Sequence, residues 1–205
     1  MKIIGIYPGN FQPAHRGHVL AYKKLRQIVG TDVFVITTDR TPIPDAPLNF
    51  GEKENIWVRH GVPASHVVKV DNWMKPVEVF SRVSPGHTNA IFALTEKEES
   101  EIKKQKRAPK GNPPVGHEHG HDDLHTVEVW VNPDGSPTYF QPYKGNEHNM
   151  ESLDKHGYVI VIDDNIIDGK PVSTTNIREG LGSEKFTEEQ KKLFFKWSFG
   201  WFDIG

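Results

Sequence analysis

Residues 2–18 read Lys-Ile-Ile-Gly-Ile-Tyr-Pro-Gly-Asn-Phe-Gln-Pro-Ala-His-Arg-Gly-His and place a strand, a turn and a helix start in succession. The first seven of these residues predict a short buried strand, and the glycine and prolines that follow are typical of a turn. Ala21, Leu25 and Ile28 then recur at helical spacing, so we expect them to share the apolar face of a helix. A helix start after a glycine turn gathers phosphate oxygens, because free backbone N–H groups and the positive end of the helix dipole point the same way.

Three basic side chains stand at this predicted helix start. His15 and His18 could donate hydrogen bonds to a phosphate and partly neutralise charge that builds up on it, and Arg16 adds a fixed positive charge beside them. The stretch therefore predicts phosphate chemistry.

The spacing Gly9-x-Phe11-x-Pro13-x-His15-x-Gly17-His18 resembles the GxFxPxHxGH signature of the HxGH nucleotidylyltransferase superfamily, whose members are cytidylyltransferase-like. Its wording is most similar to the archaeal-type nicotinamide-nucleotide adenylyltransferase branch. A second segment near the other end of the chain, Ser-Thr-Thr-Asn-Ile-Arg at residues 173–178, resembles the IS-S/T-T-x-x-R motif of the same superfamily. Two motifs in the right order are more specific than either one alone.

The resemblance implies an enzyme in which an acceptor oxygen attacks the α-phosphorus of a nucleoside triphosphate and releases pyrophosphate. It implies that His15 and His18 hydrogen-bond the triphosphate, with His18 acting most directly on the transition state. It also implies Mg²⁺ bound with the nucleoside triphosphate, carried by phosphate oxygens and water rather than by protein ligands. The other residues that it implies are the catalytic Arg178, which holds the β- and γ-phosphates with Ser173, Thr174 and Thr175, and the nucleotide-binding Gly9, Asn10, Phe11 and Gly17.

The acceptor is read from weaker signals. Asp71 and Trp73 stand where the archaeal-type branch has an aspartate and a tryptophan near the nicotinamide end of its acceptor, although Trp73 is better explained as an ordinary core residue. The branch usually carries arginine at the position of Asn10, so one phosphate contact is expected to be missing here. We expect ATP and nicotinamide mononucleotide as substrates. A cytidylyltransferase, another phosphorylated acceptor and a non-catalytic nucleotide-binding module remain as alternatives.

Further apolar runs extend the pattern to an α/β fold. We predict strands at 32–38, 67–70, 89–95 and 158–162, with helices between them at about 51–60 and 76–83. This alternation predicts a Rossmann-like parallel sheet with helices on both faces, whose ligands bind beyond the carboxyl ends of the strands. Within the helix at 51–60 we expect Ile56 and Trp57 to face inward. Lys53 and Arg59 could face the site, but we expect both to be solvated cations on an exposed helix face.

Residues of about 97–156 form an insertion that matches no part of the superfamily pattern. A charged run at 96–110 predicts a solvated helix, and alternation on both sides of an Asp-Gly turn predicts a hairpin of residues 126–131 and 137–141. The tract at 117–125 holds four histidines and three carboxylates, but a loop does not preorganise ligands, and we do not expect a physiological metal site there.

The end of the chain predicts two more helices. One is expected to start near Asn176, with Arg178 in its first turn. The other, at about 187–202, opens with a capping box of Thr187 and Gln190 and is rich in aromatic residues. Most of these rings should pack on the domain, and any aromatic face left over would mark a surface for self-association, so a homo-oligomer is left open.

Composition sets the outer bounds. The 205 residues suit one domain, 1–205, that contains the insertion. A net charge of -2 gives no general field for nucleic acid, and the absence of cysteine excludes disulfides and thiolate-bound zinc. We find neither an apolar run long enough to span a membrane nor a signal-peptide pattern, so we expect a soluble, cytoplasmic protein with no membrane partner.

Overall fold

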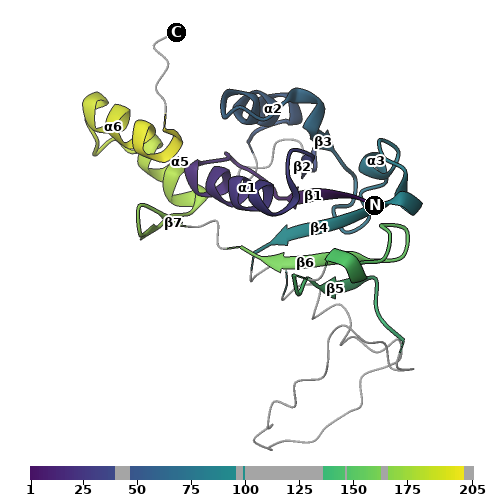
Figure 1. The fold of residues 1–205 in the computed structure, drawn as a ribbon. Helices are drawn as coiled ribbons and strands as arrows, with labels where there is room; N and C mark the ends of the chain where they lie inside the picture. The colour runs from purple at the N-terminus through teal and green to yellow at the C-terminus, as the bar shows by residue number, and fades with distance from the viewer. Residues whose placement is uncertain (40–46, 96–98, 100–135, 146, 163–165, 201–205) are drawn as a thin grey trace, which may run out of the picture.

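A parallel sheet forms the centre of the protein. The computed structural model describes residues 1–39, 47–95, 99, 136–145, 147–162 and 166–200. Within them, six strands lie in the order β3-β2-β1-β4-β6-β5, and every neighbouring pair is parallel (Figure 1). Helices flank this sheet, which confirms the predicted Rossmann-like α/β class.

The elements lie close to the predicted ranges. The strands are β1 (Lys2–Pro8), β2 (Val33–Thr37), β3 (Val67–Lys69), β4 (Thr88–Leu94), β5 (Phe140–Pro142), β6 (Gly157–Val161) and the small antiparallel pair β7 (Ile166–Ile167) and β8 (Lys170–Pro171). The helices are α1 (Arg16–Val29), α2 (Phe50–Arg59), α3 (Val77–Phe80), α5 (Thr174–Gly182) and α6 (Glu188–Phe199), with short 3₁₀ turns η1 (Ala64–His66), η2 (Pro85–His87) and η3 (Glu147–Asn149).

The two faces of the sheet carry separate apolar cores, because side chains alternate along each strand. Tyr7 and Ile91 point to the face that α1 and α2 cover, whereas Ile6 and Phe92 point to the face that α3 covers. A third cluster joins α5 to α6. Figure 1 shows these two helices beyond the carboxyl ends of β4 and β6, the edge at which parallel sheets of this class bind their ligands.

Helix α1 approaches β1 very closely at Gly5. A Cβ added to Gly5 would lie 2.9 Å from the side chain of Leu25. The apolar stripe of α1 runs through Ala21, Tyr22 and Leu25, and Val29 continues it, partly buried against the same core. We expected Ile28 on this stripe, but it is 39% exposed. Successive residues of a helix are rotated by about 100°, so Ile28 points away from the face on which the next residue, Val29, is partly buried.

The rest of the sequence predictions have mixed outcomes. Helix α3 is four residues long and ends at Phe80 rather than near residue 83. The first arm of the predicted hairpin, the charged run at 96–110 (apart from residue 99) and the histidine tract at 117–125 fall outside the described residues. Of the second arm, Phe140–Pro142 is a strand that pairs in parallel with β6. Within the described ranges, no helix combines the length and apolarity that a membrane span requires.

Candidate active site

The loop between β1 and α1 is held in place by its own side chains. Phe11 has a left-handed backbone, with φ 47°, and its ring folds back over Gly9. A Cβ on Gly9 would overlap the ring of Phe11, so any larger residue at this position would force that ring to move. The Gln12 amide donates to the carbonyl of Leu48 at 2.9 Å and accepts from its N–H at 2.8 Å. The loop is thereby fixed to the segment that enters α2.

Two histidines cap the start of α1. His15 is the N-cap residue, and its Nδ1 accepts a hydrogen bond from the N–H of Gly17 at 3.1 Å. The Nδ1 of His18 accepts from the N–H of His15 at 3.0 Å, and the two ring centroids are 3.8 Å apart. The predicted histidine pair is therefore brought together by the backbone of the helix start itself.

These contacts fix the tautomer of both rings. In a neutral imidazole one nitrogen accepts and the other carries the proton. Since Nδ1 accepts in His15 and in His18, each ring carries its proton on Nε2. The Nε2 of His15 is buried and has no hydrogen-bond partner among the described residues. The pair therefore presents two N–H groups, and one of them is a buried donor in need of an acceptor.

Burial keeps both rings neutral at pH 7. Loss of solvent lowers the pKa of His15 to about 4, and the nearby His60 adds to this effect. Burial likewise lowers the pKa of His18 well below its usual value, followed by the influence of His15 and His60. We expected the imidazoles to neutralise phosphate charge in part. With pKa values lowered in this way, both rings are instead uncharged donors.

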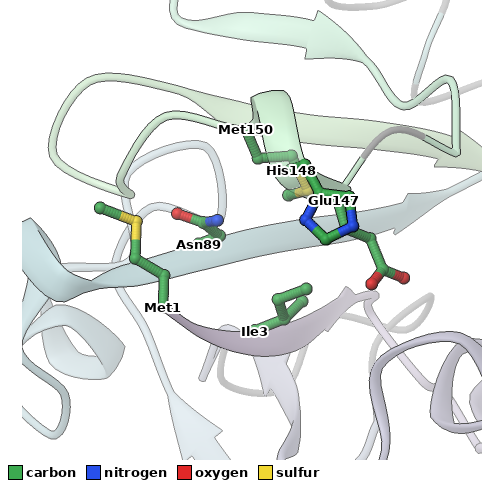
Figure 2. Close-up of a pocket in the computed structure, with 6 residues that line it drawn as sticks. All are labelled: Met1, Ile3, Asn89, Glu147, His148 and Met150. Carbon is green, nitrogen blue, oxygen red and sulfur yellow. The ribbon is translucent and has the colours of Figure 1, made fainter.

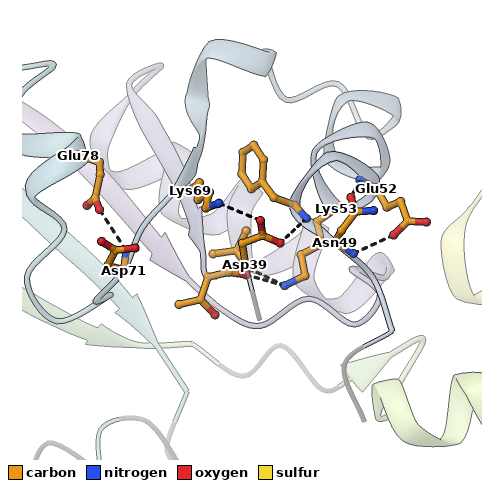
Figure 3. Close-up of polar contacts among 10 residues, drawn as sticks. Asp39, Asn49, Glu52, Lys53, Lys69, Asp71 and Glu78 are labelled. Carbon is orange, nitrogen blue, oxygen red and sulfur yellow. Dashed lines mark hydrogen bonds and ion pairs between the residues drawn. The ribbon is translucent and has the colours of Figure 1, made fainter. Parts of the chain in front are cut away.

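Lys53 was expected to be solvated, and this expectation is wrong. It is completely buried in α2. Its ammonium group donates to the carbonyl of Thr38 at 2.9 Å and to the Thr37 hydroxyl at 3.3 Å (Figure 3). It also donates to Asn10 Oδ1 at 3.5 Å. Spacing could have revealed it, because Lys53 lies four residues before the buried Trp57 and so on the same helix face. Arg59 is exposed, as expected.

A hydrogen bond from Arg178 connects the second motif, residues 173–178, to the loop of the first motif. Ser173 caps α5, and its hydroxyl accepts from the N–H of Asn176 at 3.1 Å. Because α5 begins at Thr174, Arg178 lies in the second turn and not in the first. Its Nη1 donates to the carbonyl of Gln12 at 2.6 Å, which joins the starts of α5 and α1 across 166 residues of sequence. Ser173 and Thr174 are partly exposed and Thr175 is exposed.

Arg16 faces away from the histidine pair. Its guanidinium group binds both carboxylate oxygens of Asp168 at 3.1 and 3.2 Å, and it also donates to the carbonyl of Trp197 at 3.2 Å. The positive charge that we expected beside the imidazoles is therefore largely offset by Asp168, a residue that sequence reasoning did not connect with this site.

Asp71 and Trp73 lie along the same edge of the sheet, directly after β3. Asp71 is exposed and its N–H donates to Glu78 at 3.1 Å (Figure 3). Trp73 is partly buried against the core on the α3 face. Strand β3 is two positions from β1, or about 10 Å at ordinary strand spacing.

An apolar hollow of 360 Å³ borders the loop at Pro13 and α5 at Arg178. Its walls are the aliphatic and aromatic side chains Pro47, Leu48, Ile56, Ile177, Leu181, Phe195 and Phe199. The described residues hold no group of three histidines or carboxylates that could bind a metal ion. The groups gathered at the two helix starts are donors and cations, which suit phosphate oxygens and not a bare divalent cation.

Comparison with known proteins gives one family match and several similar folds. The cytidylyltransferase-like family matches residues 6–180 of the chain. No significant match is found among the sequences of curated proteins. The fold is similar to that of a nicotinic acid mononucleotide adenylyltransferase from Plasmodium falciparum complexed with APC, with a TM-score of 0.51, 14% identity, 97% of this chain covered and 90% of that one.

Two other solved structures are more distant. One is a Vibrio parahaemolyticus protein assigned as a nicotinate-nucleotide adenylyltransferase, at a TM-score of 0.48 and 14% identity over 95% of this chain and 99% of that one. The other is NadR in complex with NR, at a TM-score of 0.49 and 16% identity over 95% of this chain and 46% of that one. At such identities structural similarity establishes only the fold, so the family rests on the sequence match. With that match spanning both motifs, the chain belongs to the cytidylyltransferase-like family and is a nucleotidyltransferase.

Proposed function

We propose that this nucleotidyltransferase moves an adenylyl group from ATP to a phosphate-bearing acceptor, nicotinamide mononucleotide, and releases pyrophosphate. The observation that carries the proposal is the pair of neutral Nε2–H donors on His15 and His18 at the start of α1, with the start of α5 tied to the same loop through Arg178. Two converging helix starts offer the backbone N–H groups and dipoles that a chain of phosphates needs.

The reaction needs no nucleophile from the protein. An oxygen of the acceptor phosphate forms a bond to the α-phosphorus, and the bond from that phosphorus to the bridging oxygen of pyrophosphate breaks. Catalysis then consists of positioning the reactants and stabilising charge on the transferring group. His15 and His18 would donate to oxygens of the α-phosphate region, and Ser173, Thr174, Thr175 and Arg178 would hold the leaving pyrophosphate. Mg²⁺, when bound with the nucleotide, would supply further neutralisation of the phosphates.

Lys53 offers a reason why Asn10 suffices where the archaeal-type branch usually has arginine. Its ammonium group lies under the loop, 3.5 Å from Asn10 Oδ1. A buried cation at this depth adds positive potential to the loop without itself contacting the ligand, since the described contacts already occupy its three N–H groups. We therefore assign Lys53 a positioning role.

ATP and nicotinamide mononucleotide are chosen from the loop wording Gln12-Pro13-Ala14-His15 and from the position of Trp73. A pyridinium ring is flat and cationic, so an indole face would provide stacking and cation–π attraction. The family match alone is equally compatible with CTP and with other phosphorylated acceptors.

The test is pyrophosphate release from the full-length chain with Mg²⁺, either ATP or CTP, and a panel of phosphate monoesters that includes nicotinamide mononucleotide. We expect release only with ATP and nicotinamide mononucleotide, and a dinucleotide product by mass spectrometry. Release with CTP or with another acceptor would correct the substrates and leave the reaction class intact. Nucleotide binding by calorimetry with no release for any pair would favour a binding module.

A further inference from the structure

A second pocket lies at the opposite edge of the sheet, where β1 and β4 begin. It has a volume of 350 Å³ and is lined by Met1, Ile3, Asn89, Glu147, His148 and Met150 (Figure 2). This volume is at the lower end of the range found for small-molecule sites, about 300–1,000 Å³. Parallel strands that share their carboxyl ends at one edge also share their amino ends at the other, so the pocket is separate from the histidine pair by the length of β1.

Asn89 is the unusual member of this lining. It is the second residue of β4, directly beside Ile3 of β1, and only 3% of its surface is exposed. Its amide oxygen is buried and has no hydrogen-bond partner among the described residues. Buried polar atoms in native proteins are nearly always paired, so this oxygen calls for a donor that the described part of the chain does not supply.

The other residues that line the pocket limit the kinds of ligand that could donate a hydrogen bond to Asn89 Oδ1. Ile3, Met1 and Met150 offer apolar, adaptable walls, and Figure 2 shows the His148 ring across the space from the Asn89 amide, with Ile3 beneath. The second polar oxygen group is the Glu147 carboxylate, which already accepts from the Tyr143 hydroxyl at 3.3 Å. The two oxygens accept hydrogen bonds, whereas the amide nitrogen of Asn89 donates. A matching ligand therefore donates an N–H group to an oxygen, can accept from the amide nitrogen, and buries an otherwise flat or apolar body.

We propose that this pocket binds a flat heteroaromatic ring that carries an exocyclic amino group, of which adenine is the simplest probe. One amino N–H binds Asn89 Oδ1, as asparagine amides bind the amino group of adenine in nucleic-acid complexes. The ring lies between His148 and the side chains of Ile3 and Met150. The site is independent of the nucleotide position proposed at the carboxyl edge.

The three methionines of the chain provide the test. Met1 and Met150 line the pocket, whereas Met74 follows β3 at the carboxyl edge. In protein labelled with ¹³C at the methionine methyl groups, titration with adenine should shift the Met150 resonance saturably and leave Met74 in place. Hypoxanthine, which has a carbonyl oxygen in place of the amino group, should give no saturable shift.

Three variants distinguish binding at this pocket from its alternatives. Asn89→Leu removes the acceptor and should weaken adenine binding at least tenfold, with thermal unfolding as the check that the variant folds. Asn89→Asp keeps an acceptor oxygen and should retain binding if Asn89→Leu proves unstable. His18→Ala, at the other edge, should leave the Met150 titration unchanged. The proposal is overturned if adenine shifts Met74 instead of Met150, if hypoxanthine binds equally well, or if no saturable shift occurs and the amide is satisfied by water alone.

Discussion

The start of α1 is capped by a capping box in which both side chains are imidazoles. The usual box pairs Ser or Thr at the N-cap with Glu or Gln three residues later. Here His15 and His18 take these roles through Nδ1, and the buried Nε2–H of His15 has no partner among the described residues. A glutamate at the second position would place negative charge where phosphates are proposed to bind. The same four residues therefore stabilise the helix start and supply its donors.

We predict that capping and catalysis at His18 can be separated. His18→Gln retains a side-chain oxygen that can accept from the N–H of His15, so the thermal midpoint should change little. Turnover should fall by about 10²–10³, the usual cost of removing one donor to a transition state. His18→Ala should lose turnover equally and stability as well, because it also removes the cap and the edge contact with Phe11 at 5.2 Å.

The matched control for both variants is His87→Gln in η2, which changes an exposed histidine. Near-normal pyrophosphate release from folded His18→Gln would contradict the assigned role of Nε2.

At the scale of elements, α2 links the loop to the sheet. Its start is capped by Asn49, and Asp39 at the end of β2 accepts from the Phe50 N–H at 3.1 Å and pairs with Lys69 at 2.9 Å (Figure 3). The hydrogen bonds from Lys69 and Phe50 lower the pKa of the Asp39 carboxyl group. Helix α2 is thus positioned from both sides, which allows a lysine within it to reach the underside of the loop.

We predict that Lys53→Met loses both stability and nucleotide binding. The substitution leaves the buried acceptors of Thr37 and Thr38 without their donor, a cost of about 1–3 kcal/mol in the free energy of unfolding. It also removes positive potential under the loop, so the KM for ATP should rise. Arg59→Met, on the exposed side of the same helix, is the control and should alter neither quantity. A stable Lys53→Met variant with unchanged KM would refute the positioning role.

We predict that Trp73→Ala weakens the binding of nicotinamide mononucleotide roughly tenfold, equivalent to about 1.4 kcal/mol, with little effect on ATP. Because Trp73 also packs on the core of the α3 face, Trp73→Phe is the control that retains an aromatic ring. Calorimetry in the presence of a non-hydrolysable ATP analogue measures both variants. If the unmodified protein binds no nicotinamide mononucleotide under these conditions, the acceptor assignment falls and the transferase assignment stands.

The elements whose ends were predicted well have strong local signals. Strands such as β1 and β4 are continuous apolar runs, and the capping boxes at Asn49 and Thr187 mark helix starts directly. What the sequence did not reveal depends on contacts between distant segments. The pairing of Arg16 with Asp168 spans 152 residues, and the bond from Arg178 to the Gln12 carbonyl spans 166. No local pattern encodes either contact, although the two motifs that the Arg178 bond joins were visible in the sequence.

At the scale of the whole molecule, the parallel sheet separates two edges with different chemistry. The carboxyl edge gathers both motifs, and the amino edge holds the Asn89 pocket. Three histidines on the α1 and α2 face are buried or partly buried, namely His15, His18 and His60. Burial lowers the pKa of His60 to about 4, with a smaller contribution from Lys23.

We predict that stability falls as the pH is lowered from 7 to 4. In this window the unfolded chain takes up protons on these histidines at their ordinary pKa near 6.5, whereas the folded protein, with pKa values of about 4 at His15 and His60, does not. Proton uptake by the unfolded state therefore lowers the free energy of unfolding as the pH falls, until the histidines of the folded protein are protonated as well. The thermal midpoint measured at several pH values should follow this curve, and His60→Leu should make it shallower. An unchanged slope in His60→Leu would contradict the prediction.

The surroundings of Trp57 also give the molecule an optical signal. Its indole is fully buried, its N–H has no partner among the described residues, and Tyr7, Phe11, Tyr22 and His60 surround it with centroid distances of 5.0 to 6.4 Å. An indole without a polar partner emits at short wavelength, and a protonated imidazole beside it quenches that emission. A ligand that displaces Phe11 would therefore change the fluorescence of Trp57 with no label added, and acid would dim the same band as His60 gains its proton.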